Sequence, residues 1–147
     1  MSEDLELVIT RVFDAPRELV FRAWTDRNHL TSWWGPRGFR ATSWTMDVRP
    51  GGAWRGCMRS TGGLDYWSQG VYREITPPEK LLFTFAWDGD HDMPTTETVV
   101  TIFFTEEDGK TKMTFRQTPF DSVEQRDSHE EGWSESFEGL AAYVTGQ

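Results

Sequence analysis

The stretch SVEQRDSHEEGWSESFEGLAAYVTG, residues 122–146, decides the fold of this chain. Its apolar side chains recur every three or four residues, which is the spacing of one face of an α-helix. The apolar residues are Trp133, Phe137, Leu140, Ala141 and Val144, and His129 precedes them at the same spacing. Ser122 followed by Gln125 has the form of a capping box, and Gly146 is a natural stop. The stretch predicts one long C-terminal helix with an apolar face that needs a cover.

Gly132 lies in the middle of this predicted helix. A glycine in a helix interior costs about 1 kcal/mol relative to alanine. We therefore expect close packing against another element at that position.

Upstream of this helix, residues 39–118 alternate apolar and polar side chains between short turns rich in Gly and Pro. Leu81, Phe83, Phe85 and Trp87 alternate in this way with smaller or polar neighbours. The predicted strands are Leu5–Phe13, Phe39–Val48, Ala53–Ser60, Tyr66–Ile75, Lys80–Trp87, Glu97–Thr105 and Lys110–Thr118. Because the connections are short, of which 106–109 is an example, we expect an antiparallel meander.

Two short helices are predicted after the first strand. Asp14 is expected to cap the first, with Pro16 in its first turn. The second is expected over 26–33 and to end at Gly35 and Pro36. The fold class is therefore α+β: a curved antiparallel sheet of about six to seven strands wrapped around the long C-terminal helix.

Aromatic residues are unusually frequent, with eight Trp, ten Phe and three Tyr in 147 residues. Rings interleaved with a few polar groups are typical of a small-molecule cavity, while the alternative is a solid aromatic core. Strand alternation alone does not decide which face of the sheet lines such a cavity. The predicted ligand-binding residues are Trp44, Trp54, Trp67, Phe83, Phe85, Trp87, Phe103, Phe115, His129, Trp133 and Phe137.

The net charge of −9 and the isoelectric point near 4.8 argue against nucleic acid and anionic membranes as partners. The single cysteine, Cys57, excludes an intramolecular disulfide and is interpreted as a packed small residue. The acidic N-terminus and the lack of a long apolar run predict no signal peptide and no membrane span. We expect a cytoplasmic protein.

His129 shares a helix face with Trp133 and Phe137 and is the candidate for a general base or polar anchor. The alternative is a histidine at the rim that pairs with nearby carboxylates. His29 and His91 do not stand at metal-ligand spacing, so we expect no metal and no cofactor, and we assign no catalytic residue.

Four arginines, Arg40, Arg55, Arg59 and Arg73, lie in predicted strands among aromatic residues. One or two could point inward and hold a ligand anion, or all could lie on the solvent face. The pair Trp33 and Trp34 could form an exposed partner patch, cap the cavity mouth, or plug the structure.

The chain resembles the helix-grip superfamily of START-like and Bet v 1-like domains, and within it the branch named after the C-terminal domain of the activator of Hsp90 ATPase. The resemblance covers essentially the whole chain. The stretches that carry it are RVFDAPRE (11–18), VFRAWTD (20–26), WWGP (33–36), DVRPGG (47–52), GVYREI (70–75), PPEKL (77–81) and HEEGW (129–133).

The resemblance implies a helix-grip fold and a single START-like domain over residues 1–147. Members of the superfamily bind lipids, hormones, polyketides and other hydrophobic ligands, and some catalyse cyclisation or dehydration. The first hypothesis is therefore a module that binds a hydrophobic or aromatic small molecule. The alternatives are an enzyme of cyclase or hydrolase type that uses the same cavity, and a stress-related interaction module resembling a co-chaperone.

The co-chaperone that names the branch contacts Hsp90 through a separate N-terminal domain, and 147 residues leave no room for it. We therefore do not expect Hsp90 as a partner. A homodimer formed through the sheet or the N-terminal strand is left open.

Overall fold

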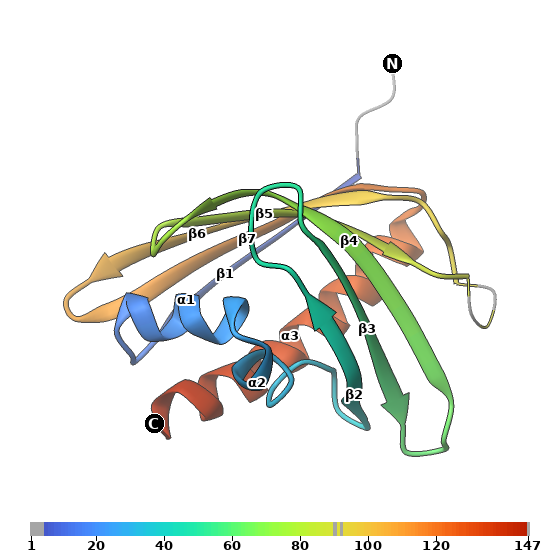
Figure 1. Cartoon of the computed structure of the whole chain (residues 1–147), viewed down its shortest axis with the longest axis horizontal. Coiled ribbons are helices and arrows are strands. Elements are labelled where there is room, and N and C mark those ends of the chain that lie inside the picture. The colour runs from blue at the N-terminus through green and yellow to red at the C-terminus, as the bar shows by residue number, and fades with distance from the viewer. Residues whose placement is uncertain (1–4, 90, 92, 147) are drawn as a thin grey trace.

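The computed structural model describes residues 5–89, 91 and 93–146, which form one seven-stranded sheet with three helices. In chain order the elements are β1 (Leu5–Phe13), α1 (Arg17–Thr25), α2 (Arg27–Leu30), β2 (Phe39–Met46), β3 (Ala53–Ser60), β4 (Asp65–Thr76), β5 (Lys80–Trp87), β6 (Thr98–Glu107), β7 (Lys110–Phe120) and α3 (Val123–Thr145). Neighbouring strands are antiparallel in the order β1-β7-β6-β5-β4-β3-β2. The curved sheet arches over α3 (Figure 1), so the predicted α+β helix-grip architecture is confirmed.

The helix starts differ from the sequence prediction. α1 begins at Arg17, and the capping position belongs to Pro16 rather than to Asp14. Pro16 has an extended backbone, with ψ at 148°, and therefore lies before the first turn and not in it. α2 is shorter than predicted and begins after Asp26, whose carboxylate accepts from the backbone N–H groups of Asn28 and His29.

Strand ends shift by up to two residues from the predicted ones. The largest consequence is at the β6–β7 hairpin, where Glu107 pairs with Lys110 and only Asp108 and Gly109 remain in the turn. Both turn residues have positive φ, 52° and 79°, as a type I′ hairpin turn requires. The predicted four-residue connection is therefore a tight turn.

Alternation along the strands separates an inner face from an outer one. On β5, Leu81, Phe83 and Phe85 are buried on the concave side. On β3, Trp54 faces inward, whereas Arg55 lies on the outer side over the ring of Trp67, 4.6 Å from its centroid. The Arg55–Trp67 pair therefore shows which strand residues lie on the outer face, a question that the sequence did not decide.

Two strand glycines allow the concave side to be filled with indole rings. A Cβ on Gly56 would lie 2.2 Å from the Trp44 ring, and one on Gly70 would lie 1.8 Å from the carbonyl oxygen of Thr84. That same carbonyl accepts a hydrogen bond from Trp54 Nε1 at 3.1 Å. The missing side chains are thus the space in which Trp44 and Trp54 lie.

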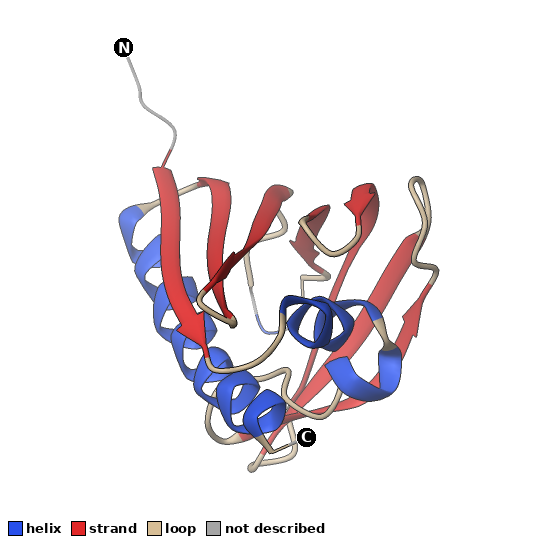
Figure 2. Ribbon diagram, turned by 90° about the vertical axis from the view of Figure 1, so that its left-hand side faces the viewer, coloured by secondary structure: helices blue, strands red, loops and turns tan. Residues whose placement is uncertain are grey.

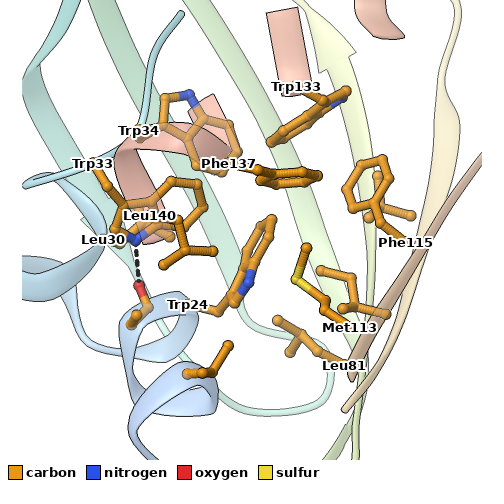
Figure 3. Close-up of a cluster of buried hydrophobic side chains, with 14 of the residues drawn as sticks. Trp24, Leu30, Trp33, Trp34, Leu81, Met113, Phe115, Trp133, Phe137 and Leu140 are labelled. Atoms are coloured by element: carbon orange, nitrogen blue, oxygen red, sulfur yellow. Dashed lines mark hydrogen bonds between the residues drawn. The ribbon is translucent and has the colours of Figure 1, made fainter. Parts of the chain in front are cut away.

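Trp24 of α1 lies at the centre of the core. Its ring contacts those of Trp33, Trp34, Phe83, Phe115, Trp133 and Phe137, with centroids 4.8–6.3 Å apart. Figure 3 shows Leu81, Met113 and Leu140 closing the cluster around it. Trp33 is fixed beside it by a 2.9 Å hydrogen bond from Nε1 to the carbonyl of Ala23. This half of the interior is solid.

α3 is closest to one side of the sheet. It contacts β1 and β7, and Figure 2 shows it running beside the edge strand that leads from the N-terminus. Half of the predicted capping box is present, because Ser122 Oγ accepts from the backbone N–H of Gln125. The Gln125 side chain instead accepts from the backbone N–H of Asp121, and not from that of Ser122. The backbone of α3 runs alongside β1 and β7. Its N-terminal half is therefore separated from the backbones of β3, β4 and β5.

Candidate functional site

A cavity of about 280 Å³ occupies the gap between the N-terminal half of α3 and the side of the sheet made by β2 to β5. It is lined by Trp34, Pro36, Phe39, Met58, Tyr66, Phe85, Trp87, Met93, Ser128, His129, Gly132, Trp133 and Ser136. These residues come from four strands, from the segment after α2, from the β5–β6 loop and from α3. The cavity therefore lies where the sheet and the helix diverge.

Small residues of α3 form one wall. Ser128, Gly132 and Ser136 follow one another at intervals of four residues and so lie on one helix face. A Cβ on Gly132 would have no atom within 4 Å. The expectation of close packing at Gly132 is therefore wrong: the glycine borders open space, and its lack of a side chain leaves room in the cavity.

A buried polar chain fixes Trp133, which forms the inner end of the cavity. Its Nε1 donates to Gln117 Oε1 at 2.8 Å. The Gln117 Nε2 donates to Thr98 Oγ1 at 2.8 Å, and that hydroxyl donates to the carbonyl of Phe85 at 3.1 Å. Along this series of hydrogen bonds, Trp133, Gln117 and Thr98 each donate to an acceptor. The Trp133 indole therefore has one defined orientation.

His129 closes the cavity next to Trp87. Trp87 Nε1 donates to His129 Nε2 at 3.0 Å, so this nitrogen is unprotonated and the ring carries its proton on Nδ1. The imidazole also lies against the rings of Phe85 and Phe120. Burial lowers the pKa of His129 to about 4, which makes the side chain neutral at pH 7.

The partner of His129 is therefore an indole, and not a carboxylate as the rim interpretation supposed. A general base works best with a pKa near the operating pH and with a free basic nitrogen. His129 has neither, because its pKa is low and its Nε2 is engaged. Its geometry is that of a neutral polar anchor within the wall.

The cavity wall carries no Lys, Arg, Asp or Glu among the described residues. The four arginines considered from the sequence lie elsewhere. Arg55 pairs with Gln69 and Asp88 and stacks on Trp67, and Arg59 pairs with Asp65. Arg73 lies 3.8 Å from Glu97 and Arg40 is exposed. The chamber is therefore uncharged, although the protein carries nine net negative charges.

The structure divides the eleven predicted ligand-binding residues into three groups. Phe85, Trp87, His129 and Trp133 line the cavity together. Trp44, Trp54 and Phe83 surround a second void of only about 10 Å³, and Phe115 and Phe137 are fully buried in the core. Trp67 lies on the outer face under Arg55, and Phe103 is 46% exposed beside Lys80. Both interpretations of the aromatics therefore apply, each to one half of the interior.

Other lining residues were not among the eleven predicted ones, although the sequence had already offered Trp34 as a cap, a plug or an exposed patch. Trp34 is 7% exposed and packs between Trp44 and Trp133, so it forms no exposed patch and instead separates the cavity from the solid core. Phe39 and Tyr66 also line the cavity and pack edge to face, with centroids 5.6 Å apart. The WWGP stretch was the available signal for Trp34, whereas small residues such as Ser136 carried none.

Two further structural features bear on the kind of protein this is. The described residues contain no group of three His, Cys, Asp or Glu side chains that could hold a metal ion. Within the same residues, no helix has both the length and the apolar character needed to cross a membrane.

Comparison with known proteins agrees with this architecture. Residues 14–145 match the model of the family described as activator of Hsp90 ATPase homolog 1-like protein. The chain belongs to this family. A search of functionally curated proteins returns no match.

Solved structures of similar fold extend over nearly all of this AHSA1-like chain. A Chromobacterium violaceum protein is 28% identical, with a TM-score of 0.86 over 95% of this chain and 96% of its own. An AHSA1 protein from Silicibacter pomeroyi is also 28% identical, with a TM-score of 0.84 over 95% and 97%. An Arthrobacter aurescens protein is 27% identical, with a TM-score of 0.86 over 98% and 88%.

Proposed function

We propose that this AHSA1-like protein binds a small, uncharged and largely apolar molecule in the cavity between α3 and β2–β5. One observation carries the proposal: a chamber of about 280 Å³ has aromatic and methionine walls, a few polar atoms and no charged side chain among the described residues. Ligand sites have this composition, with apolar walls and few polar groups that fix orientation. Membership of the family is consistent with a ligand-binding module.

The size of the cavity limits the ligand. A dry apolar cavity of about 150 Å³ in another protein holds one benzene molecule. A chamber of about 280 Å³ is roughly twice that size and fits a ligand of about two fused rings. Naphthalene is therefore a suitable probe.

Binding is favoured over acid–base catalysis for a specific reason. The cavity contains one imidazole and no carboxylate among the described residues, and the imidazole already accepts the indole N–H of Trp87. A binding role requires only the apolar surface of the cavity and the neutral anchor.

The test is a titration of ¹⁵N-labelled protein with naphthalene, followed through the indole N–H resonances. We expect the signals of Trp34, Trp87 and Trp133 to shift with saturation, because these three rings line the cavity. Trp67 lies on the outer face under Arg55 and is the internal control. Absence of any saturable shift, or shifts as large at Trp67 as at Trp133, would refute the proposal.

Native mass spectrometry of the purified protein complements this titration. A stoichiometric hydrophobic passenger, identified after solvent extraction, would give the chemical class of the natural ligand.

A further inference from the structure

Three indole rings line the cavity, and two of their N–H groups are already bound within the protein. Trp87 Nε1 donates to His129 Nε2, and Trp133 Nε1 donates to Gln117 Oε1. Trp34 is the third, and its Nε1 has no hydrogen-bond partner among the residues that the structure describes. Of the three indole N–H groups in the wall, that of Trp34 is therefore the one that no described residue accepts.

Trp34 borders the chamber, and its donor lies on the side of the ring away from the solid core. The side chain is 7% exposed, so more than nine-tenths of it is buried. Trp24 Nε1 is completely enclosed by protein atoms, whereas Trp34 Nε1 is not. Figure 3 shows the Trp34 nitrogen on the side of its ring that faces away from Trp24 and the solid core. Since Trp34 lines the cavity, we take this side of the ring, away from the core, as the one that borders the cavity.

A second polar group in the wall has the same character. Ser136 on α3 is buried and lines the cavity, and its hydroxyl makes no hydrogen bond to any described residue. A hydroxyl can donate or accept. The chamber thus offers the Trp34 N–H and the adaptable Ser136 hydroxyl to a ligand. Its wall also includes Tyr66, Ser128 and His129, the last with its proton on Nδ1.

Resting on the proposed function, we propose that the ligand is a neutral aromatic molecule that carries a hydrogen-bond acceptor, such as a ketone, and that Trp34 Nε1–H donates to this acceptor. A pure hydrocarbon would leave the buried N–H without a partner, which is unfavourable. A carboxylate would enter without a cation to pair with it, and a quaternary ammonium has no lone pair to accept the Trp34 N–H. An uncharged acceptor satisfies the donor without these costs.

The experiment compares four naphthalene derivatives by calorimetric titration of the wild-type protein. They are 2-acetylnaphthalene, its near-isosteric hydrocarbon 2-isopropenylnaphthalene, 2-naphthoate, and trimethyl(2-naphthylmethyl)ammonium. We expect the ketone to bind roughly three- to tenfold more tightly than the hydrocarbon, which corresponds to one neutral hydrogen bond. We expect both charged compounds to bind more weakly than the ketone.

The same titration is repeated with the Trp34→Phe variant, in which the donor is missing and an aromatic ring remains. The preference for ketone over hydrocarbon should disappear. Trp67→Phe removes an indole from the outer face and is the matched control, in which the preference should persist. If Trp34→Phe folds poorly, the wild-type Trp34 indole resonance replaces it: the ketone should shift this proton signal downfield and the hydrocarbon should not.

The outcomes separate this proposal from the proposed function. Equal affinity for ketone and hydrocarbon overturns the role of Trp34 while leaving an apolar binding site. Tightest binding of the ammonium or of the naphthoate also overturns it. Failure of all four compounds to bind refutes the proposed function itself.

Discussion

Trp133 Nε1 lies 2.8 Å from Oε1 of Gln117, a glutamine with no exposed surface. This hydrogen bond links the helix that forms one wall of the cavity to β7, the strand next to the sheet edge. Through Thr98 it continues to the backbone of β5, from which Phe85 and Trp87 enter the opposite wall. The ring at the inner end of the cavity is therefore held by the sheet, not by the helix alone.

The Gln117→Leu variant tests the contribution of this polar chain to stability. Leucine fills a similar volume but leaves the Trp133 N–H without an acceptor, and this should lower the free energy of unfolding by about 1–3 kcal/mol. Urea denaturation measures the change. Adding Trp133→Phe, which removes the orphaned donor, should cost less than the sum of the two single changes. Strict additivity would contradict the account.

His129 should make the stability of the protein depend on pH. Its pKa in the folded state, about 4, lies below the unfolded value of 6.5, so the unfolded state binds more protons between these values. The contribution is complete above pH 6.5 and is lost as the pH falls toward 4, by up to about 3 kcal/mol. Denaturation curves from pH 4 to 8 measure it.

The matched variant for that measurement is His129→Gln. Its amide oxygen can accept from Trp87 but does not titrate in this range. The difference in stability between wild type and variant should therefore change with pH between 6.5 and 4. A constant difference would show that His129 is not the responsible group.

Gly132→Ala should stabilise the protein. The position is in the interior of α3, and the added Cβ meets no atom within 4 Å. The gain should be about 0.5–1 kcal/mol, which is the difference in helix propensity. Thermal denaturation measures it, and a loss of stability would mean that Gly132 is closely packed.

Gly56→Ala should have the opposite sign. The Cβ would lie 2.2 Å from the Trp44 ring, which is itself stacked parallel to Trp54 with centroids 5.8 Å apart. Since the void beside these rings measures only about 10 Å³, too little to accept a displaced ring, the variant should lose at least about 1–3 kcal/mol. An unchanged midpoint in urea would contradict the packing described for β3.

The fold could be predicted from sequence because its signals are local. The alternation in β5, the turn residues between strands and the helical spacing from Trp133 to Val144 each specify an element within a few residues. The face on which Trp67 lies could not be predicted in this way, because Tyr66 and Trp67 are successive rings in β4. Only the pairing of β4 with β3 shows that the Trp67 ring lies on the outer face.

The cavity was predictable only in part, because it results from the divergence of two elements that are distant in sequence. Phe83 and Phe85 have the same chemistry and face the same side of β5, yet Phe83 meets the solid core around Trp24 and Phe85 lines the cavity. The open space at Gly132 has no counterpart in the sequence, where a helical glycine equally fits close packing.

The most direct test of the central claim fills the cavity from within. Gly132→Leu extends a side chain along the helix face shared by Ser128 and Ser136, both of which line the chamber. Gly132→Ala changes helix propensity in the same direction with little added volume. We predict that calorimetric titration with 2-acetylnaphthalene gives similar affinity for wild type and Gly132→Ala, and at least about tenfold weaker binding for Gly132→Leu. Equal affinity of all three proteins for this compound would contradict a ligand site between α3 and the sheet.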